Sequence, residues 1–472
     1  MKKYFAMSAV LLPLVPATAC THSHSEKPNI IFILADDMGY GDLSCYGQER
    51  FSTPNIDRMA AQGMRFTQHY AGSSVSAPSR SSVITGLTTG HTPIRANRVV
   101  GGEGQVPIPG GTSQMFRFLR ANGYSTGCFG KWGLGGPGTE GDPMNQCVDE
   151  FYGYNCQRAA HAYYPYTLWH NSERVTLEGN AGHGEEQYAP ELIHEQAEVF
   201  IRKHAQKPFF LWYTTTLPHA ELRLPEEEIA PFVGRPSLQP EKVFRGVDDG
   251  PRYKNGAYGS QEHAHAAFAA MITYLDKRVG AIMDLLDELG IAEETILIFA
   301  SDNGPHKEAG ADPEFFNSNG PFRGIKRDLY EGGIRVPFIV RWPEVVKPGT
   351  ETDHVSAFWD LFPTVADVLG EKLEQTDGLS FLPTLSGKGR QQEHHHLYWE
   401  FHESGGRQAV RMGKWKAVRY NIRDHGPVEL YDLESDPGET NDLSSQYPEK
   451  VEEMENLFLT SRTPSDIFEF VF

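Results

Sequence analysis

Four continuous apolar runs dominate the pattern of hydrophobic and polar positions along the chain. They are NIIFILA at 29–35, FFLWY at 209–213, TILIFA at 295–300 and VPFIVRW at 336–342. A half-exposed strand alternates apolar and polar residues, whereas a run without alternation indicates a strand that is buried on both faces. The pattern therefore predicts the strands of a mostly parallel sheet.

Segments with helical periodicity precede two of these strands. Apolar residues recur on one helical face before the second and third runs, and a glycine at 290 marks the expected end of the later helix. The residues on these faces are Ile193, Ala197, Phe200, Ile201, Phe268, Met271, Ile272, Leu275, Val279, Ile282 and Leu286. Strands that alternate with such helices are typical of a doubly wound α/β fold with helices on both faces of the sheet.

The pattern changes beyond about residue 390. Segments 408–420 and 428–444 read as short antiparallel strands joined by turns, and a helix is expected around 447–460. We therefore expect a large α/β domain over 27–390 and a small α+β subdomain over 391–472. Glycine- and proline-rich stretches near 98–112, 133–143 and 303–324 are expected to be long loops that form the wall of a pocket.

The N-terminal segment MKKYFAMSAVLLPLVPATAC has a basic start, an apolar run broken by Pro13 and Pro16, and small residues before Cys20. These features predict a secretory signal over 1–19. The letters ATAC also resemble a bacterial lipobox, which predicts that Cys20 is lipidated; ordinary cleavage after Ala19 is the alternative. No later run reaches the roughly 18 apolar residues that a spanning helix needs, so we expect a soluble or lipid-tethered mature chain.

Charge limits the choice of partner. Removal of residues 1–19 takes away Lys2 and Lys3 and no acid, so the formal charge changes from −19 to −21. A surface this acidic argues against binding to nucleic acid. An anionic substrate would need a local basic pocket.

Export would also permit disulfides. The cysteines after the leader are Cys45, Cys128, Cys147 and Cys156, and their spacing fits no metal site. A bond between Cys147 and Cys156 is one reading and buried free thiols are the other.

Polar side chains follow three of the predicted strands. Asp36 and Asp37 follow the first, His219 closes the second, and Asp302 with Asn303 follow the third. Ligands of doubly wound sheets gather beyond the carboxyl ends of the strands. Short oxygen ligands suit a hard cation such as Ca²⁺, although an aspartate pair after a strand can instead cap the next helix.

Basic residues beside glycine or proline could face an anion. Lys131 lies in GKW, Lys326 in GIK, and Arg80 follows Pro78 and Ser79, where we expect the first turn of a helix. Each of these residues alone could equally be a solvated surface charge, and a lone histidine such as His219 is more often structural than catalytic.

Their combination resembles the sulfatase family. The segment SAPSR at 76–80, followed by SSVITG, is similar to the sulfatase signature of Cys or Ser, any residue, Pro, a small residue and Arg. DDMGYGDL, GKWGLG, TLPH, SDNG, RGIKRDLYEGGIRVP and LYDLESDPGETNDL resemble further family blocks in the family's order. The resemblance covers the mature chain and indicates a serine-type, formylglycine-dependent type I sulfatase of the alkaline phosphatase superfamily, similar to Bacteroides-like exported carbohydrate sulfatases.

The resemblance implies roles for the residues named above. Ser76 would be oxidised to formylglycine (3-oxoalanine), whose hydrate attacks sulfur and later expels sulfate by re-forming the aldehyde. One Ca²⁺ per chain would be held by residue 76 and by Asp36, Asp37, Asp302 and Asn303. Arg80 and Lys131 would hold the formylglycine, and Lys326 and His219 would contact the sulfate and assist the leaving oxygen.

One position departs from the family pattern. Many members read GKWHLG, with a histidine thought to help collapse the sulfated intermediate, whereas this chain has Gly133. His306 in DNGPHKE is our candidate substitute, with His91 behind it.

A serine at position 76 also implies a maturation partner, an anaerobic radical SAM sulfatase-maturating enzyme. Together with the lipobox, this suggests a periplasmic or outer-membrane lipoprotein of a Gram-negative anaerobe.

Two stretches mix aromatic, histidine and charged residues as carbohydrate sites do: 155–171 and 394–411. The candidate substrate contacts in them are His161, His170, Trp399, Glu400, His402 and Arg407. The resemblance favours a galactose or N-acetylgalactosamine sulfate of mucin, glycosaminoglycan or algal glycans, 6-O before 4-O or 3-O. Two alternatives remain: a phosphatase or phosphodiesterase with unmodified Ser76, and an inactive glycan-binding surface protein.

Overall fold

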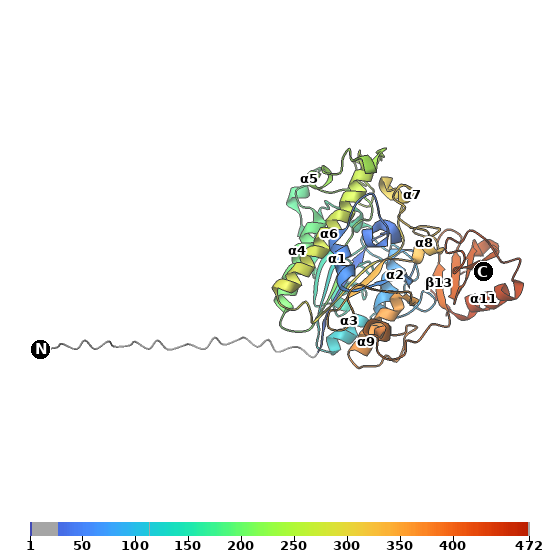
Figure 1. The fold of residues 1–472 in the computed structure, drawn as a ribbon. Coiled ribbons are helices and arrows are strands. Elements are labelled where there is room, and N and C mark those ends of the chain that lie inside the picture. The colour runs from blue at the N-terminus through green and yellow to red at the C-terminus, as the bar shows by residue number, and fades with distance from the viewer. Residues whose placement is uncertain (2–26, 113, 471–472) are drawn as a thin grey trace.

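The computed structural model describes Met1, residues 27–112 and residues 114–470 (Figure 1). The expected signal segment and Cys20 lie outside the described residues. No helix in the described part of the chain is long and apolar enough to cross a bilayer.

A ten-stranded sheet forms the centre of the larger part of the molecule, in the order β11-β2-β10-β9-β1-β8-β4-β5-β6-β7. Its strands are β1 (Asn29–Ala35), β2 (Met64–Phe66), β4 (Ser125–Lys131), β5 (Glu150–Tyr154), β6 (Thr167–His170), β7 (Glu173–Thr176), β8 (Phe209–Thr214), β9 (Thr295–Ser301), β10 (Phe338–Arg341) and β11 (Thr350–Thr352). The inner strands β9, β1, β8, β4 and β5 run parallel to one another. Three of the four predicted strands, β1, β8 and β9, therefore lie side by side as parallel neighbours, and the predicted fold class is confirmed.

The fourth predicted strand runs the other way. β10 is antiparallel to β9, although its apolar run reads like those of the parallel strands. A parallel connection needs a crossover that returns to the opposite edge of the sheet. The chain between β9 and β10 contains only 3-10 turns and the short helices α7 (Pro313–Phe316) and α8 (Glu331–Ile334), so it stays at one edge and enters β10 from there.

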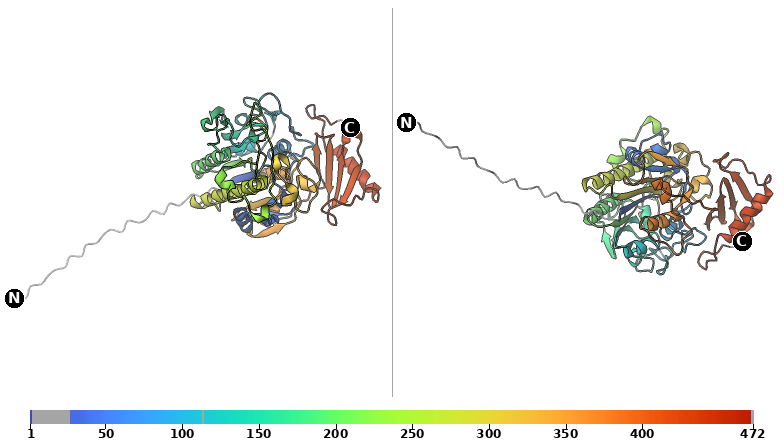
Figure 2. Two further views of the ribbon diagram at one scale, coloured as in Figure 1. Left: turned by 90° about the horizontal axis from the view of Figure 1, so that it is seen from above. Right: turned by 60° about the horizontal axis from the view of Figure 1, so that its bottom comes forward.

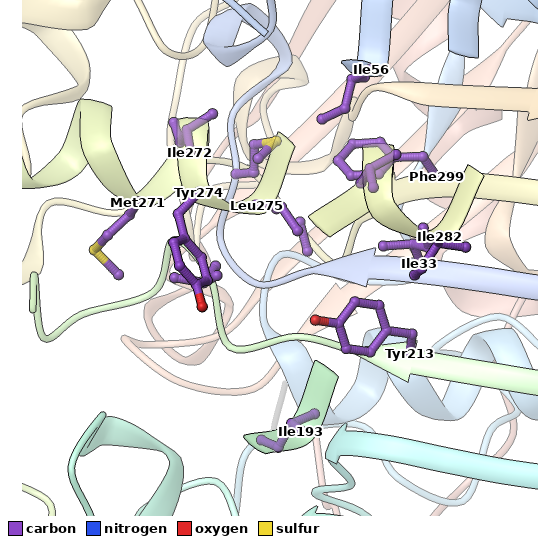
Figure 3. Packing of buried hydrophobic residues seen from close by; sticks show 14 of the residues in the cluster. Ile33, Ile56, Ile193, Tyr213, Met271, Ile272, Tyr274, Leu275, Ile282 and Phe299 are labelled. Carbon is purple, nitrogen blue, oxygen red and sulfur yellow. The ribbon is translucent and has the colours of Figure 1, made fainter. Parts of the chain in front are cut away.

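Helices cover both faces of the sheet. Alternate residues of β1 point to opposite faces of the sheet. On one face, Ile31 and Ile33 pack with α1 (Pro54–Gln62), α4 (Ala189–His204) and α6 (Ala264–Glu288). On the other face, Ile30 and Phe32 pack with α2 (Ser76–Thr85), α3 (Met115–Ala121) and α9 (Leu361–Val368). Figure 3 shows the first of these layers around Ile33 and Phe299. The predicted helical faces lie in it, and Gly290 follows the end of α6 in the left-handed conformation.

The C-terminal part is a four-stranded antiparallel sheet of β13 (Leu397–Phe401), β14 (Arg407–Met412), β15 (Trp415–Tyr420) and β16 (Val428–Asp432). α11 (Pro448–Thr460) packs on one face, and the other face packs against the larger domain, as the two views of Figure 2 show. The remaining elements are β3 (His69–Tyr70), which pairs with β12 (Ser356–Ala357), and the short helices α5 (Glu226–Ile229) and α10 (Leu382–Ser386).

The cysteines in the described part of the chain are free thiols. Of the two readings left open by the sequence, the structure therefore favours free thiols over a Cys147–Cys156 bond. Cys156 is buried and Cys147 is half-buried.

A buried ion network joins the two parts. The Lys416 ammonium on β15 lies 2.9 Å from carboxylate oxygens of both Glu331 on α8 and Glu439, and all three residues are fully buried. Burial opposes the charged form of Glu331, but Lys416, Arg335 and Arg411 together outweigh it and lower the pKa of Glu331 to about 2. The network therefore holds the small sheet on the larger domain by charge as well as by apolar contact.

We predict that Lys416→Met destabilises the protein by about 3–5 kcal/mol, because it leaves the buried Glu439 without its cation and Glu331 with Arg335 as its remaining ion-pair partner. Lys414→Met is the matched control: its ammonium pairs with Asp432 at the surface, where such pairs contribute about 0–1 kcal/mol. Urea denaturation of both variants measures the difference. Equal losses would show that the buried network adds no net stability.

Candidate active site

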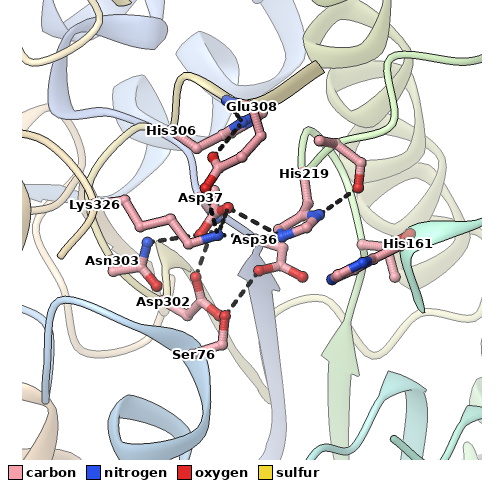
Figure 4. Close-up of polar contacts among 12 residues, drawn as sticks. Asp36, Asp37, Ser76, His161, His219, Asp302, Asn303, His306, Glu308 and Lys326 are labelled. Atoms are coloured by element: carbon pink, nitrogen blue, oxygen red, sulfur yellow. Dashed lines mark hydrogen bonds and ion pairs between the residues drawn. The ribbon is translucent and has the colours of Figure 1, made fainter. Parts of the chain in front are cut away.

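The polar residues that follow β1, β4 and β9 meet at the carboxyl edge of the sheet. Asp36 and Asp37 follow β1, Asp302 and Asn303 follow β9, and Lys131 is the last residue of β4. β9 and β8 flank β1, and β4 lies next to β8, so the ends of these strands are neighbours. The side chains of Asp36, Asp37, Asp302 and Asn303 converge on one point (Figure 4), and Lys131 reaches it through its contact with Asp36. These five residues are at most 1% exposed.

Ser76 lies at the centre of this cluster as the first residue of α2. Its hydroxyl donates to Asp36 at 3.1 Å and accepts from Lys131 at 3.2 Å, while the Lys131 ammonium also contacts Asp36 at 2.7 Å. The helix N-terminus adds a favourable field for negative charge on this oxygen. The geometry is that of an oriented nucleophile.

Arg80 lies in the second turn of α2, not in the first as the sequence suggested, because the helix begins at Ser76 and already includes Pro78. Its guanidinium donates to Asp302 at 3.0 Å and to the carbonyl oxygen of Lys131 at 2.8 Å. Arg80 therefore ties the nucleophile helix to both strand ends.

The acidic cluster fits a divalent cation. Carboxylate oxygens of Asp36 and Asp37 lie within 4.8 Å of each other and of a ring nitrogen of His219. The amide nitrogen of Asn303 donates to Asp37 at 2.7 Å, whereas its Oδ1 atom is buried and has no hydrogen-bond partner among the described residues. A buried unpartnered oxygen beside carboxylates is what a hard cation such as Ca²⁺ requires.

The charges of the cluster are balanced. Asp36, Asp37 and Asp302 face the cations Arg80, Lys131 and Lys326, and Lys326 contacts Asp37 at 2.6 Å. Burial opposes ionisation of Asp36 and Asp37, yet Lys131 and Lys326 hold their pKa values below the usual range. For Asp302, burial and the charge of Asp36 win over Arg80 and raise the pKa to about 7.

His219 lies beside Lys326 and Asp37. Its Nε2 atom is 3.2 Å from the Lys326 ammonium and 3.3 Å from Asp37, and its Nδ1 atom contacts the carbonyl oxygen of Ala220. Burial, helped by the charge of Lys326, lowers the pKa of His219 to about 3. The neutral ring can therefore accept a hydrogen bond from Lys326.

His306, the candidate substitute for the missing family histidine, stacks on His219 with 5.6 Å between ring centroids. Its Nε2 atom faces the carbonyl oxygen of Pro218 at 3.1 Å, and its Nδ1 atom lies 3.2 Å from Glu308. Both ring nitrogens are engaged, so this placement does not support direct contact with Ser76. His91 pairs with Asp377 at 2.8 Å and does not belong to the cluster.

The space beside Gly133 is filled by Gln157. Gly133 has φ +74°, and a Cβ atom there would lie 3.0 Å from the amide nitrogen of Gln157. That nitrogen is buried and has no hydrogen-bond partner among the described residues. Gly133 also bonds to the carbonyl oxygen of Asn155 at 3.1 Å, next to the end of β4 that carries Lys131. An unused donor thus stands beside Gly133, the position where the family pattern expected from the sequence has histidine.

The predicted substrate contacts fall into two groups. His161 stacks on His219 with centroids 5.1 Å apart, and Arg407 bonds to Asp328, two residues beyond Lys326. Both border the cluster. His402 belongs to neither group: it contacts Glu400 at 2.9 Å and packs against Phe470, and these contacts involve no residue of the cluster.

The other three do not face the cluster. Trp399 is fully buried between the two domains and donates to the carbonyl oxygen of Ala71 at 2.9 Å. Glu400 is fully buried against Arg95 and Arg462. His170 is exposed at the far end of β6, which runs away from the carboxyl edge because it is antiparallel to β5. These placements do not support a sugar contact, and the first two are explained by packing and ion pairing.

Sequence reasoning missed Glu308 and Tyr258. Glu308 contacts His306 and Arg327 beside the cluster, and its position in DNGPHKE could have drawn attention to it. Tyr258 lies 5.0 Å from the ring of His161. No pattern in the sequence marks it.

A serine at a helix N-terminus that contacts a lysine and lies beside an acidic cluster suited to a cation is typical of ester hydrolases with an alkaline phosphatase-like fold. Comparison with protein families places the chain more narrowly. The model described as Sulfatase matches residues 28–371, and the one described as N-sulphoglucosamine sulphohydrolase, C-terminal matches residues 323–462. The chain belongs to the sulfatase family and is a sulfuric ester hydrolase.

Known relatives agree with this placement. The chain is 32% identical to an N-acetylgalactosamine-6-O-sulfatase of Bacteroides thetaiotaomicron, over 96% of this chain and 99% of that one. It is 31% identical to arylsulfatase A of Homo sapiens, over 91% and 86% of the two chains. Among solved structures, Ps i-CgsB in complex with k-i-k-neocarrahexaose superposes with a TM-score of 0.75 at 27% identity, covering 93% of this chain and 94% of that one.

A second solved structure comes from work on the metabolism of multiple glycosaminoglycans by Bacteroides thetaiotaomicron. It superposes with a TM-score of 0.74 at 28% identity and covers 92% of this chain and 99% of that chain.

We predict that Ca²⁺ and sulfate bind cooperatively, because the carboxylates of the cluster are already paired with cations and each added ion supplies the charge that compensates the other. Ca²⁺ at 100 times its Kd stabilises the fold by about 2.7 kcal/mol. Sulfate should increase the affinity for Ca²⁺ by the same factor as Ca²⁺ increases the affinity for sulfate. Thermal unfolding across a grid of both ions measures the coupling.

Asn303→Ala removes the unpartnered oxygen and should lower the affinity for Ca²⁺ about tenfold. Asn456→Ala, exposed on α11, is the control and should leave it unchanged. Independent effects of the two ions, or an undiminished response of Asn303→Ala, would contradict this account of the cluster.

Proposed function

We propose that this protein removes sulfate from a carbohydrate, using Ser76 matured to formylglycine and one Ca²⁺. The observation that carries the proposal is the environment of the Ser76 hydroxyl, which lies between Asp36 at 3.1 Å and Lys131 at 3.2 Å. An unmodified serine would be left as a sulfate ester, whereas a formylglycine hydrate supplies a second hydroxyl through which the sulfate can be expelled.

The chain's own residues divide the work around position 76. Asp36, Asp37, Asp302 and Asn303 are the residues that would hold the metal, whose charge lowers the pKa of the nucleophile and offsets that of the sulfate. Lys131 orients the hydroxyl at position 76 through its ammonium. Arg80 keeps Asp302 in place and fixes α2 against the end of β4.

Lys326 and His219 are suited to the leaving group. The Lys326 ammonium can contact a sulfate oxygen, and it lies 3.2 Å from the Nε2 atom of His219. A proton held between these two atoms can pass to the sugar oxygen as the S–O bond breaks. Because the ring of His219 is neutral and its Nε2 atom accepts from Lys326, the Lys326 ammonium is the group that holds this proton and His219 orients it.

For the substrate we propose a galactose or N-acetylgalactosamine sulfate, 6-O before 4-O or 3-O, in mucin, glycosaminoglycan or algal glycans. The N-acetylgalactosamine-6-O-sulfatase from Bacteroides thetaiotaomicron supports the sugar and the position, since it matches nearly the whole chain at 32% identity. Ps i-CgsB with its bound k-i-k-neocarrahexaose supports an oligosaccharide as the larger ligand.

Ser76→Ala should abolish turnover of sulfate esters. In active protein, the peptide that contains residue 76 should be two hydrogens lighter than its serine form. Ser82→Ala is the matched control in the same helix: the Ser82 hydroxyl has no hydrogen-bond partner among the described residues, so activity should be kept. Peptide mass spectrometry and sulfate release are measured on the same sample, made with an anaerobic maturase.

Protein that turns over sulfate esters with an unmodified Ser76 would refute the formylglycine mechanism. Efficient turnover of phosphate esters by unmodified protein, without sulfatase activity after maturation, would instead establish a phosphatase.

In a screen of monosulfated sugars, we expect the highest kcat/KM on N-acetylgalactosamine 6-sulfate or galactose 6-sulfate. The 4-O and 3-O isomers should be at least tenfold slower, because a shifted ester cannot reach residue 76 while the ring keeps its contacts. N-acetylglucosamine 6-sulfate, which differs from N-acetylgalactosamine 6-sulfate only at C4, serves as the control for the configuration there. A preference for 4-O or 3-O esters would overturn the positional assignment and leave the sulfatase activity intact.

A further inference from the structure

A cavity opens at the carboxyl end of β5, and no residue of the cluster around Ser76 lines it. We call it the β5 pocket; its volume is about 440 Å³. The lining residues that matter here are Glu103, Arg158, Tyr166, Trp169, Arg174 and Lys254.

The β5 pocket lies next to the active site. β4 and β5 are parallel neighbours in which Lys131 pairs with Tyr154, and Tyr154 lines the pocket. Adjacent strands are about 4.8 Å apart, so the pocket begins one strand away from the lysine that contacts Ser76. The chain confirms the proximity: Ala159 lines the pocket, and His161, two residues on, stacks on His219 at 5.1 Å.

Gly256 links the β5 pocket to the residues beside the active site. His161 contacts the carbonyl oxygen of Gly256 at 3.1 Å, and Arg158 packs directly against Gly256. A glycan with one sugar next to His161 would therefore bring the neighbouring sugar close to Arg158.

The β5 pocket is basic in an acidic protein. Three cations, Arg158, Arg174 and Lys254, line it with one carboxylate, Glu103, which pairs with Arg174. Arg158 donates to the carbonyl oxygen of Asn255, and Lys254 donates to those of Asn180 and Gly184. Neither Arg158 nor Lys254 forms an ion pair among the described residues. On a chain with a formal charge of −19, two such uncompensated cations favour an anionic ligand.

Aromatic side chains complete the pocket. Tyr166 is 40% exposed, and the Lys254 ammonium lies 5.4 Å from its ring centroid. Trp169 donates its indole N–H to Glu103 at 2.7 Å and so has a fixed orientation. Exposed aromatic rings pack against the apolar faces of sugars, so the pocket combines a sugar platform with charge.

We propose that the β5 pocket binds the sugar next to the one that is desulfated, and that Arg158 and Lys254 recognise an anionic substituent, a sulfate or a carboxylate, on that sugar. This inference rests on the proposed function for the position of the reacting sugar. It makes the protein selective for glycans that carry charge on consecutive residues.

The test compares Arg158→Gln and Lys254→Gln with Arg252→Gln, an exposed cation in the same loop that does not line the pocket. Each matured variant is assayed with a 6-sulfated monosaccharide and with disaccharides whose second sugar is neutral, sulfated or a uronic acid. We expect kcat/KM to fall about tenfold only for the two charged disaccharides, because one charge-assisted contact is lost.

The control variant and the uncharged substrates should be unaffected. The larger loss among the two charged disaccharides identifies sulfate or carboxylate as the preferred group. Equal losses on every substrate, or no loss on any, would overturn the proposal.

Direct binding separates this inference from the proposed function. Isothermal titration with protein that keeps Ser76 as serine measures the Kd of the charged disaccharides lacking the 6-sulfate, so no turnover is needed. Binding that weakens about tenfold in Arg158→Gln, together with a lack of sulfatase activity in matured protein, would keep the pocket and refute the function.

Sulfatase activity in the matured protein, together with a Kd that neither Arg158→Gln nor Lys254→Gln changes, would overturn the proposed pocket and keep the proposed function. Tyr166→Ala, which removes the exposed ring and leaves both cations, should weaken the neutral and charged disaccharides alike. This separates stacking from charge recognition if either charge variant is poorly folded.

Discussion

Three carboxylates are buried at one point of this molecule, and the site depends on the three buried cations that face them. Removing a single charge from water costs several kcal/mol, so Asp36, Asp37 and Asp302 could not share a site without Arg80, Lys131 and Lys326. Each cation comes from a different segment: α2, the end of β4, and the loop before α8. The electrostatic requirement therefore also fixes how these segments meet around Ser76.

The same balance explains why the site suits its chemistry. A cluster whose carboxylates are already paired with cations accepts a divalent cation and a sulfate ester together more readily than either alone. The side chain of Lys326 would have to move when sulfate binds. Its ammonium contacts Asp37 at 2.6 Å in the structure, and the same ammonium would contact a sulfate oxygen. Its neighbour His219 offers a second contact at 3.2 Å, so the ammonium can move without losing every partner.

The sequence predicted what depends on local pattern and on short motifs. Apolar runs gave β1, β8 and β9, and the residues after strands identified the acid cluster, because strand ends of a parallel sheet meet at one edge. The direction of β10 could not be predicted, since it depends on where the preceding loop lies and not on the composition of the strand. The burial of Trp399 and Glu400 was also out of reach: an aromatic next to an acid reads as a sugar site, but the packing of two domains placed both inside.

Gly133, which stands where the family pattern has histidine, is a second position at which the sequence alone did not identify the neighbouring residue. His306 was chosen from its motif, yet both its ring nitrogens are held by Pro218 and Glu308, whereas Gln157, which no motif marks, stands beside Gly133 with an unused amide nitrogen. Gln157 belongs to the segment after β5 that also supplies Arg158 to the β5 pocket and His161 to the wall of the active site. The residues proposed for the nucleophile and the metal site come from α2 and from the ends of β1, β4 and β9, which pack in the core. The segment after β5 contributes none of them, so in the proposed function the chemistry and the recognition of the sugar rest on different segments of the chain.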